Sequence, residues 1–244
     1  MKLTSAIHSA SVELSEEAFL RAENDFLRAE LKLKDLEHSL ELIETILDCI
    51  KAEGSVSSSI ETMFGENFTS KSTAQKELED IHASIENSFI DSLFSASKKM
   101  MELLRSTEKR LVEVAKKYSS QELGFPIEVT IPRIAHGDKN EEDLNLFYSA
   151  FKDPSDDNIK KLQDARVETP VEAKCATIGN WGSFVHDIIK SLEGIEFKGE
   201  QIAKESDETL KKRKSMVVRL YERALLNAAR AFIASGNKLI AGKA

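Results

Sequence analysis

The hydrophobic residues between positions 19 and 50 follow one another at alternating steps of three and four. They are Phe19, Ala22, Phe26, Ala29, Leu33, Leu36, Leu40, Ile43, Leu47 and Ile50. This spacing places one narrow apolar seam along one side of a helix and predicts a partner helix that covers it. An acidic residue follows every second seam position and forms what we call the acidic ridge, Glu23, Glu30, Glu37 and Glu44. Such a ridge flanks the seam and favours a basic neighbour.

Two long helices are predicted in the first half of the chain. Ser15, followed by two glutamates, fits an N-cap, and Gly54 ends the first helix after about Glu53. Residues 54–72 are rich in Ser and Gly and predict a connector. Ser72-Thr73-Ala74-Gln75 fits a capping box and opens a second helix that extends to Tyr118. Its apolar seam has extra four-residue steps around Phe89, a stutter that turns part of the helix towards another partner.

The periodic pattern breaks between residues 119 and 169. Phe125 to Pro132 alternates apolar and polar residues between two prolines, which predicts an extended segment, although no second strand is evident. Asn140 and Asp153-Pro154 each predict the start of a short helix.

A C-terminal helix pair is predicted from residue 170 onwards. Thr169-Pro170-Val171-Glu172 fits a capping box with Pro at the first helical position. Small residues follow at helical spacing, and among them Gly179 and Ser183 are candidates for close helix–helix contact. Gly194 and Gly199 predict a turn, and the last helix covers about residues 200–235.

These elements predict an all-α fold in which long antiparallel helices form a bundle with a coiled-coil-like core and an irregular middle. We expect a single domain with three segments: two long helices in 1–118, the irregular excursion in 119–169, and the C-terminal helix pair in 170–244. All four prolines lie between residues 126 and 170, which leaves the sequence on either side free of the strongest helix breaker.

Charge is distributed unevenly over the 244 residues, whose net charge is −8. Residues 1–50 are strongly acidic and residues 210–244 strongly basic, so we predict that the acidic ridge lies close to residues 211–223. The basic run Lys211, Lys212, Arg213 and Lys214 admits three interpretations. It neutralises the acidic ridge, it binds nucleic acid, or it contacts a membrane surface, which suits the negative net charge least.

Residues that carry catalytic or metal chemistry are scattered. The five His stand at 8, 38, 82, 136 and 186, and none has another His or a Cys three or four residues away, the spacing of metal ligands on a helix. Cys49 and Cys175 are isolated on predicted helices, so we expect both to be buried core residues. Asp153, Asp156 and Asp157 lack the spacing of a calcium loop. We therefore predict a protein without catalytic residues, cofactor or metal.

Neither a membrane span nor a signal peptide is evident in the sequence. We therefore expect synthesis in the cytoplasm.

The layout resembles the internal head proteins of large tailed bacteriophages. The resemblance is carried by Ile85-Glu86-Asn87-Ser88-Phe89-Ile90, by Pro126 to Pro132, and by the Ala-rich close from Tyr221 to Lys243. It implies a helical virion protein, and Ser11-Val12-Glu13 is similar to the sites at which a prohead protease trims such proteins.

We therefore expect a non-enzymatic structural protein that self-associates or docks onto other components of an assembly. Two alternatives stay open: a crescent-shaped helical dimer that remodels membranes, and a small enzyme with its site in residues 119–169.

Overall fold

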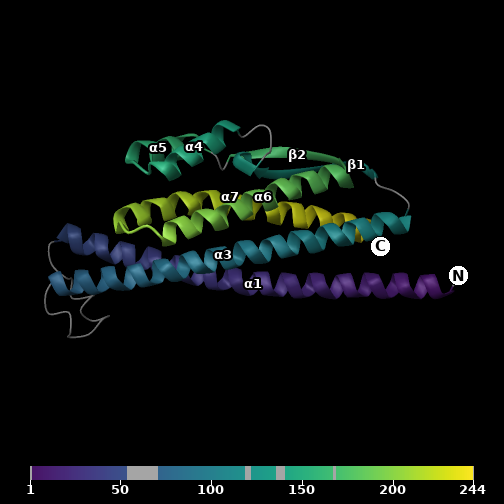
Figure 1. Cartoon of the computed structure of the whole chain (residues 1–244), viewed down its shortest axis with the longest axis horizontal. Helices are drawn as coiled ribbons and strands as arrows, with labels where there is room; N and C mark the ends of the chain where they lie inside the picture. Colours follow the sequence, from purple (N-terminus) through teal and green to yellow (C-terminus); the bar gives the residue numbers. More distant parts are fainter. Residues whose placement is uncertain (1, 54–70, 119–121, 136–140, 167–168, 244) are drawn as a thin grey trace. The chain divides into compact units, whose positions relative to one another are not determined.

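The computed structural model describes residues 2–53, 71–118, 122–135, 141–166 and 169–243 (Figure 1). The chain divides into two compact units: unit 1 contains residues 1–26 and 97–244, and unit 2 contains residues 27–96. Helices α1 (Lys2–Glu53) and α3 (Lys71–Tyr118) contribute to both units, and the remaining elements belong to unit 1. The predicted all-α class and helical bundle are confirmed, with one small sheet added. The predicted connector lies outside the described residues up to position 70.

Unit 2 is an antiparallel helical hairpin. Leu47 and Ile50 near the end of α1 pack with Leu78 near the start of α3, whereas Leu33 and Leu40 pack with Phe89 and Leu93 further along α3. Seam residues of α1 are therefore buried as predicted, with Ala29 and Leu36 partly buried at the border. The spacing of the seam thus determines which side of α1 meets α3.

Two details of these helices differ from the predictions. Helix α1 begins at Lys2 and passes through Ser15, which is therefore not an N-cap; residues 2–14 contain neither Pro nor Gly to interrupt it. In α3 the predicted seam residue Ile81 is 40% exposed, and His82 occupies the buried side in its place. The ring of His82 can take this position because its Nε2 hydrogen-bonds Glu44 Oε1 at 3.0 Å.

A two-stranded antiparallel sheet in unit 1 replaces the predicted start of a helix. Strand β1 (Glu122–Pro132) pairs with β2 (Pro170–Thr177), and Val129 lies opposite Ala173. The predicted helix at Pro170 is thus wrong in its first eight positions. Although Thr169 to Glu172 fits a capping box, residues 171–175 also alternate apolar and polar, and β1 needed a partner for its backbone hydrogen bonds.

The sheet has one buried and one exposed face. Val129, Ile131, Ala173 and Cys175 are buried, whereas Glu128, Thr130, Glu172 and Lys174 are exposed. Lys174 Nζ pairs with Glu128 Oε1 across the exposed face at 3.0 Å, and this contact raises the pKa of Lys174. Cys175 is buried as predicted but on a strand, while Cys49 is exposed, contrary to prediction.

Helix α6 (Ile178–Ala203) starts at Thr177, whose hydroxyl accepts a hydrogen bond from the Asn180 backbone at 3.1 Å. The predicted turn at Gly194 and Gly199 is wrong, because both glycines lie inside α6. Leu192, Ile195 and Ile202 continue its buried side across both positions.

Helix α7 (Glu208–Lys243) begins after a turn in which Asp207 Oδ1 accepts hydrogen bonds from the backbone of Thr209 and Leu210. It passes through Gly236, where we predicted its end. A Cβ at Gly236 would lie 2.7 Å from Thr107 Cγ2 and 3.1 Å from Trp181 Cζ2, so only glycine allows this approach of α7 to α3 and α6. The Trp181 indole donates to Phe232 O at 3.2 Å and to Ser235 Oγ at 3.1 Å.

The remaining elements of unit 1, η1 (Arg133–Ala135), α4 (Glu141–Lys152) and α5 (Asp156–Asp164), lie with the sheet on one side of the α6–α7 pair (Figure 1). Helices α4 and α5 are the two short helices predicted for the middle segment, and α5 begins two residues after Pro154, behind an N-cap at Ser155. Arg133 joins them, because its guanidinium binds both carboxylate oxygens of Asp143 at 2.7 Å and Ala165 O at 2.7 Å. The hydrogen bond to Asp143 raises the pKa of Arg133.

Replacement of Leu40 by alanine tests the buried seam. Leu40 is 2% exposed between α1 and α3, so Leu40→Ala should lower the free energy of unfolding by about 2 to 5 kcal/mol. Ile81, on α3 of the same unit, is 40% exposed and supplies the control. Ile81→Ala should cost less than about 1 kcal/mol. Urea denaturation followed by circular dichroism measures both, and equal losses would contradict the seam.

Candidate functional sites

The acidic ridge follows the border of the seam on α1. Glu23, Glu30, Glu37 and Glu44 are all partly buried. Glu30 pairs with Lys34 one turn along the same helix at 3.1 Å, and Glu44 pairs with His82. Glu23 belongs to unit 1 and the other three belong to unit 2, so their proximity to residues 211–223 of unit 1 stays a prediction.

Part of the basic run holds unit 1 together. Arg213 Nη1 lies 2.9 Å from Asp156 Oδ1 and donates to Pro154 O at 3.2 Å, which attaches the start of α5 to α7. Lys214 Nζ lies 2.8 Å from Glu205 Oε2 beyond the end of α6, and this hydrogen bond lowers the pKa of Glu205. Lys211 is partly buried and Lys212 is exposed. Arg213 and Lys214 therefore have carboxylate partners that the sequence did not reveal.

Gly179 and Ser183 lie exposed in the first two turns of α6. Ser183 Oγ donates to Gly179 O at 3.0 Å, and the nearest atom to a Cβ at Gly179 would be Thr177 Oγ1 at 3.6 Å. Neither residue mediates a tight helix contact within unit 1, so their proposed role in contacts with another chain stays a prediction. The close approach occurs instead at Gly236, which we had interpreted as a helix end.

Asp156 and Asp153, considered above as cation ligands, have protein partners. Asp156 pairs with Arg213, and Asp153 Oδ2 accepts from Asn158 Nδ2 at 3.1 Å. In the described parts of the chain, no group of three or more His, Cys, Asp or Glu side chains could hold a metal ion. None of the described helices is long and apolar enough to cross a membrane.

Exposed leucines form a second apolar row on the unit 2 part of α1. Leu27, Leu31 and Leu42 are 47%, 62% and 48% exposed. At 3.6 residues per turn they fall within about 60° of one another, on the side of the helix away from the seam. We call them the leucine row. None of the described residues of unit 2 covers them, so they are a candidate surface for contact with another molecule.

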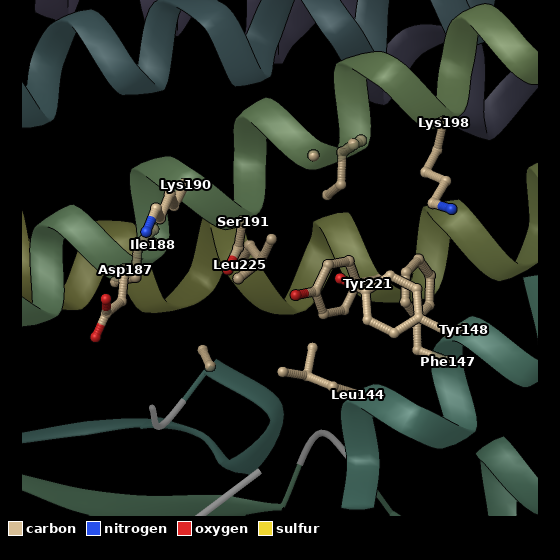
Figure 2. A pocket seen from close by; sticks show the side chains of 13 residues that line it. Leu144, Phe147, Tyr148, Asp187, Ile188, Lys190, Ser191, Lys198, Tyr221 and Leu225 are labelled. Carbon is tan, nitrogen blue, oxygen red and sulfur yellow. The ribbon is translucent and has the colours of Figure 1, made fainter. Parts of the chain in front are cut away.

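A cleft of about 620 Å³ opens in unit 1 between α4, α6 and α7 (Figure 2). Its floor includes Tyr221 and Leu225 of α7, and its walls include Phe147 of α4 and Ile188 of α6. Phe147 stacks on Tyr221 with ring centroids 4.2 Å apart. The Tyr221 hydroxyl hydrogen-bonds the side chain of Ser191, and burial raises the pKa of Tyr221 to about 12. The sequence offered no signal for this cleft, because its residues come from four separate elements, η1, α4, α6 and α7.

Glu222, beside Tyr221 on α7, is a carboxyl group that is fully buried. Ser97 of α3 donates a hydrogen bond to its Oε1, and among the described residues its Oε2 has no hydrogen-bond partner. Burial raises the pKa of Glu222 well above its ordinary value. Burial thus disfavours the ionised form of this side chain.

Comparison of the whole chain with protein-family models, with curated proteins and with solved structures gives no match.

The pH dependence of stability tests the raised pKa of Glu222. A raised pKa in the folded state adds stability that is fully present below the unfolded pKa of 4.5 and is lost as the pH rises towards the folded pKa. Glu222→Gln keeps the shape without the titrating proton. It should therefore be more stable than the wild type by at least about 1 kcal/mol near neutral pH, with the difference shrinking towards about pH 4.

Urea denaturation at several pH values measures this difference. Glu200→Gln on α6, at an exposed position, is the control and should follow the wild type throughout. A Glu222→Gln variant that is less stable than the wild type at neutral pH would show that the carboxylate is ionised and paired in the folded protein.

Proposed function

We propose that the protein is a non-enzymatic α-helical assembly component that associates with copies of itself through the leucine row of unit 2. The observation that carries this proposal is the exposure of Leu27, Leu31 and Leu42 together on one side of α1, while the seam on the other side is already covered by α3. A helix with apolar residues on two sides needs two partners, and unit 2 supplies one.

Energetics favours covering this row. Burying the exposed part of each leucine would stabilise a complex by roughly 1 to 3 kcal/mol, before the cost of association is subtracted. Unit 2 is a hairpin of two helices with a narrow core, so a further helix packed on its outer side would also increase its own stability. A second copy supplies the same leucines for a symmetric contact.

The net charge of unit 2 affects the strength of the proposed contact between two copies. Residues 27–96 carry fourteen Asp and Glu against six Lys and Arg, so two copies that meet through unit 2 bring like charges together. Screening by salt weakens this repulsion and leaves the apolar attraction intact. Self-association through the leucine row should therefore strengthen as the salt concentration rises, whereas a contact between the acidic ridge and the basic run should weaken.

Sedimentation velocity at micromolar protein concentration tests the proposal. The wild type should sediment as a dimer or larger species, more completely at high salt, because apolar side chains leave water on association. Leu27→Gln/Leu31→Gln should sediment as a monomer with unchanged helical content. Lys32→Gln, at an exposed position on the same helix, is the control and should associate like the wild type. A wild type that stays monomeric at all concentrations and salt conditions would refute the assembly function.

We further propose that the assembly is a phage virion, as the resemblance to internal head proteins implies. The membrane-remodelling alternative has less support, since Arg213 and Lys214 are paired with carboxylates in unit 1. The alternative of an enzyme in residues 119–169 has less support as well, because the charged cluster of Arg133 and Asp143 is a structural clamp between η1, α4 and the end of α5.

Trimming of the N-terminus provides a direct test of the virion proposal. Cleavage after Glu13 would make Leu14 the first residue of the protein in assembled particles. Intact-mass spectrometry and N-terminal sequencing of protein recovered from particles measure this. Protein found only with its full N-terminus, or absent from particles, would contradict the proposal.

A further inference from the structure

The cleft of unit 1 has an ammonium group at one end of an apolar channel. The channel follows one side of α6, with Asp187 and Lys190 towards one end and Lys198 at the other (Figure 2). Between these ends lie apolar surfaces from Leu144 of α4 and from Ile188 of α6. A volume of about 620 Å³ is in the range of sites that hold small molecules.

Lys198 is partly buried against aromatic rings instead of carboxylates. Its Nζ lies 4.5 Å from the ring centre of Phe151 and 5.4 Å from that of Tyr148. Within the described part of the chain, its ammonium makes no ion pair. Burial lowers the pKa of Lys198, which means that the charged form has lost part of its water without gaining an anion in return.

An anion at this position would replace the hydration that the ammonium group of Lys198 has lost. The two rings keep water from one side of Lys198, which strengthens its attraction for a negative group that approaches from the cleft. A carboxylate accepts charge-assisted hydrogen bonds from an ammonium, and the apolar surfaces beside Lys198 suit a hydrocarbon body attached to it.

We propose that the cleft binds a small amphipathic monocarboxylate, with its carboxylate at Lys198 and its hydrocarbon body along α6 over Tyr221. At the other end Asp187 and Lys190 carry opposite charges, so that end does not call for a second charged group on the ligand.

Gly194 keeps the middle of the cleft open. It lines the cleft, and a Cβ built on it has no atom within 4 Å. A larger side chain at this position therefore extends into open space without displacing the protein. It also removes a glycine from a helix interior, which favours the helical conformation of α6. A loss of ligand binding in such a variant is therefore expected without a loss of helical content.

Isothermal titration calorimetry with decanoate tests the proposal on the full-length protein. Decanoate should bind with one site per chain, and decanol and decyltrimethylammonium should bind at least about ten times more weakly, because they lack the charge-assisted contact with Lys198. Lys198→Gln should weaken decanoate binding by about the same factor and leave decanol binding unchanged.

Three variants control for general effects. Lys160→Gln changes an exposed lysine on α5, outside the cleft, and should bind decanoate like the wild type. Gly194→Ala adds only a methyl group and should retain most of the affinity, whereas Gly194→Leu fills the channel and should abolish binding of both decanoate and decanol. Circular dichroism of every variant confirms its fold.

Three results would overturn the proposal. Decanoate that fails to bind saturably at millimolar concentration leaves the cleft without this ligand class. Equal affinity for decanoate, decanol and the cationic amphiphile indicates non-specific apolar adsorption. Unchanged decanoate binding in Lys198→Gln or in Gly194→Leu places the ligand elsewhere. None of these results depends on self-association, so they leave the assembly function untouched.

Discussion

Unit 1 depends on the burial of α7 on nearly all of its sides. Helix α6 packs along it, the sheet and η1 cover a further side, and α3 approaches at Gly236. A helix surrounded in this way must be apolar around most of its circumference and small where neighbours come close. Ala224, Ala228, Ala229 and Gly236 are buried at such points, and Phe232 fills the space that the small residues leave under Trp181.

The burial of α7 also explains where its charged residues lie. Arg213 and Lys214 lie near its start, where they reach Asp156 and Glu205 on neighbouring segments. Glu222 lies where the helix is enclosed, and the lack of water around its carboxyl group raises its pKa. The same enclosure leaves an opening beside Tyr221, where α4 diverges from α6 and the cleft forms. The charged residues near the start of α7 thus attach neighbouring segments to it, whereas the carboxyl group in its enclosed part is shielded from water.

Unit 2 follows a simpler rule, because two helices can cover only one side of each other. Pairing of α1 and α3 buries Leu40 and Phe89, and it leaves Leu27, Leu31 and Leu42 in contact with water. Charged residues of both signs flank these leucines, and Arg28, Lys34 and Asp35 are exposed beside Leu31. Apolar residues within a charged surface are characteristic of contacts that form reversibly between subunits, since the charge keeps the separated chains dispersed.

The sequence by itself determined the long helices and the buried side of α1, because a repeat of three and four residues specifies which residues must share one side of a helix. It could not decide the structure of Thr169 to Thr177, where a capping box and a strand alternation overlap and the outcome depends on β1, some forty residues away. It also could not assign Gly236 or Gly194, since a glycine inside a helix is indistinguishable from a helix end until its neighbours are known. Only the tertiary structure decided the conformation at these positions and formed the cleft, because contacts between segments that are distant in the sequence select one of the alternatives.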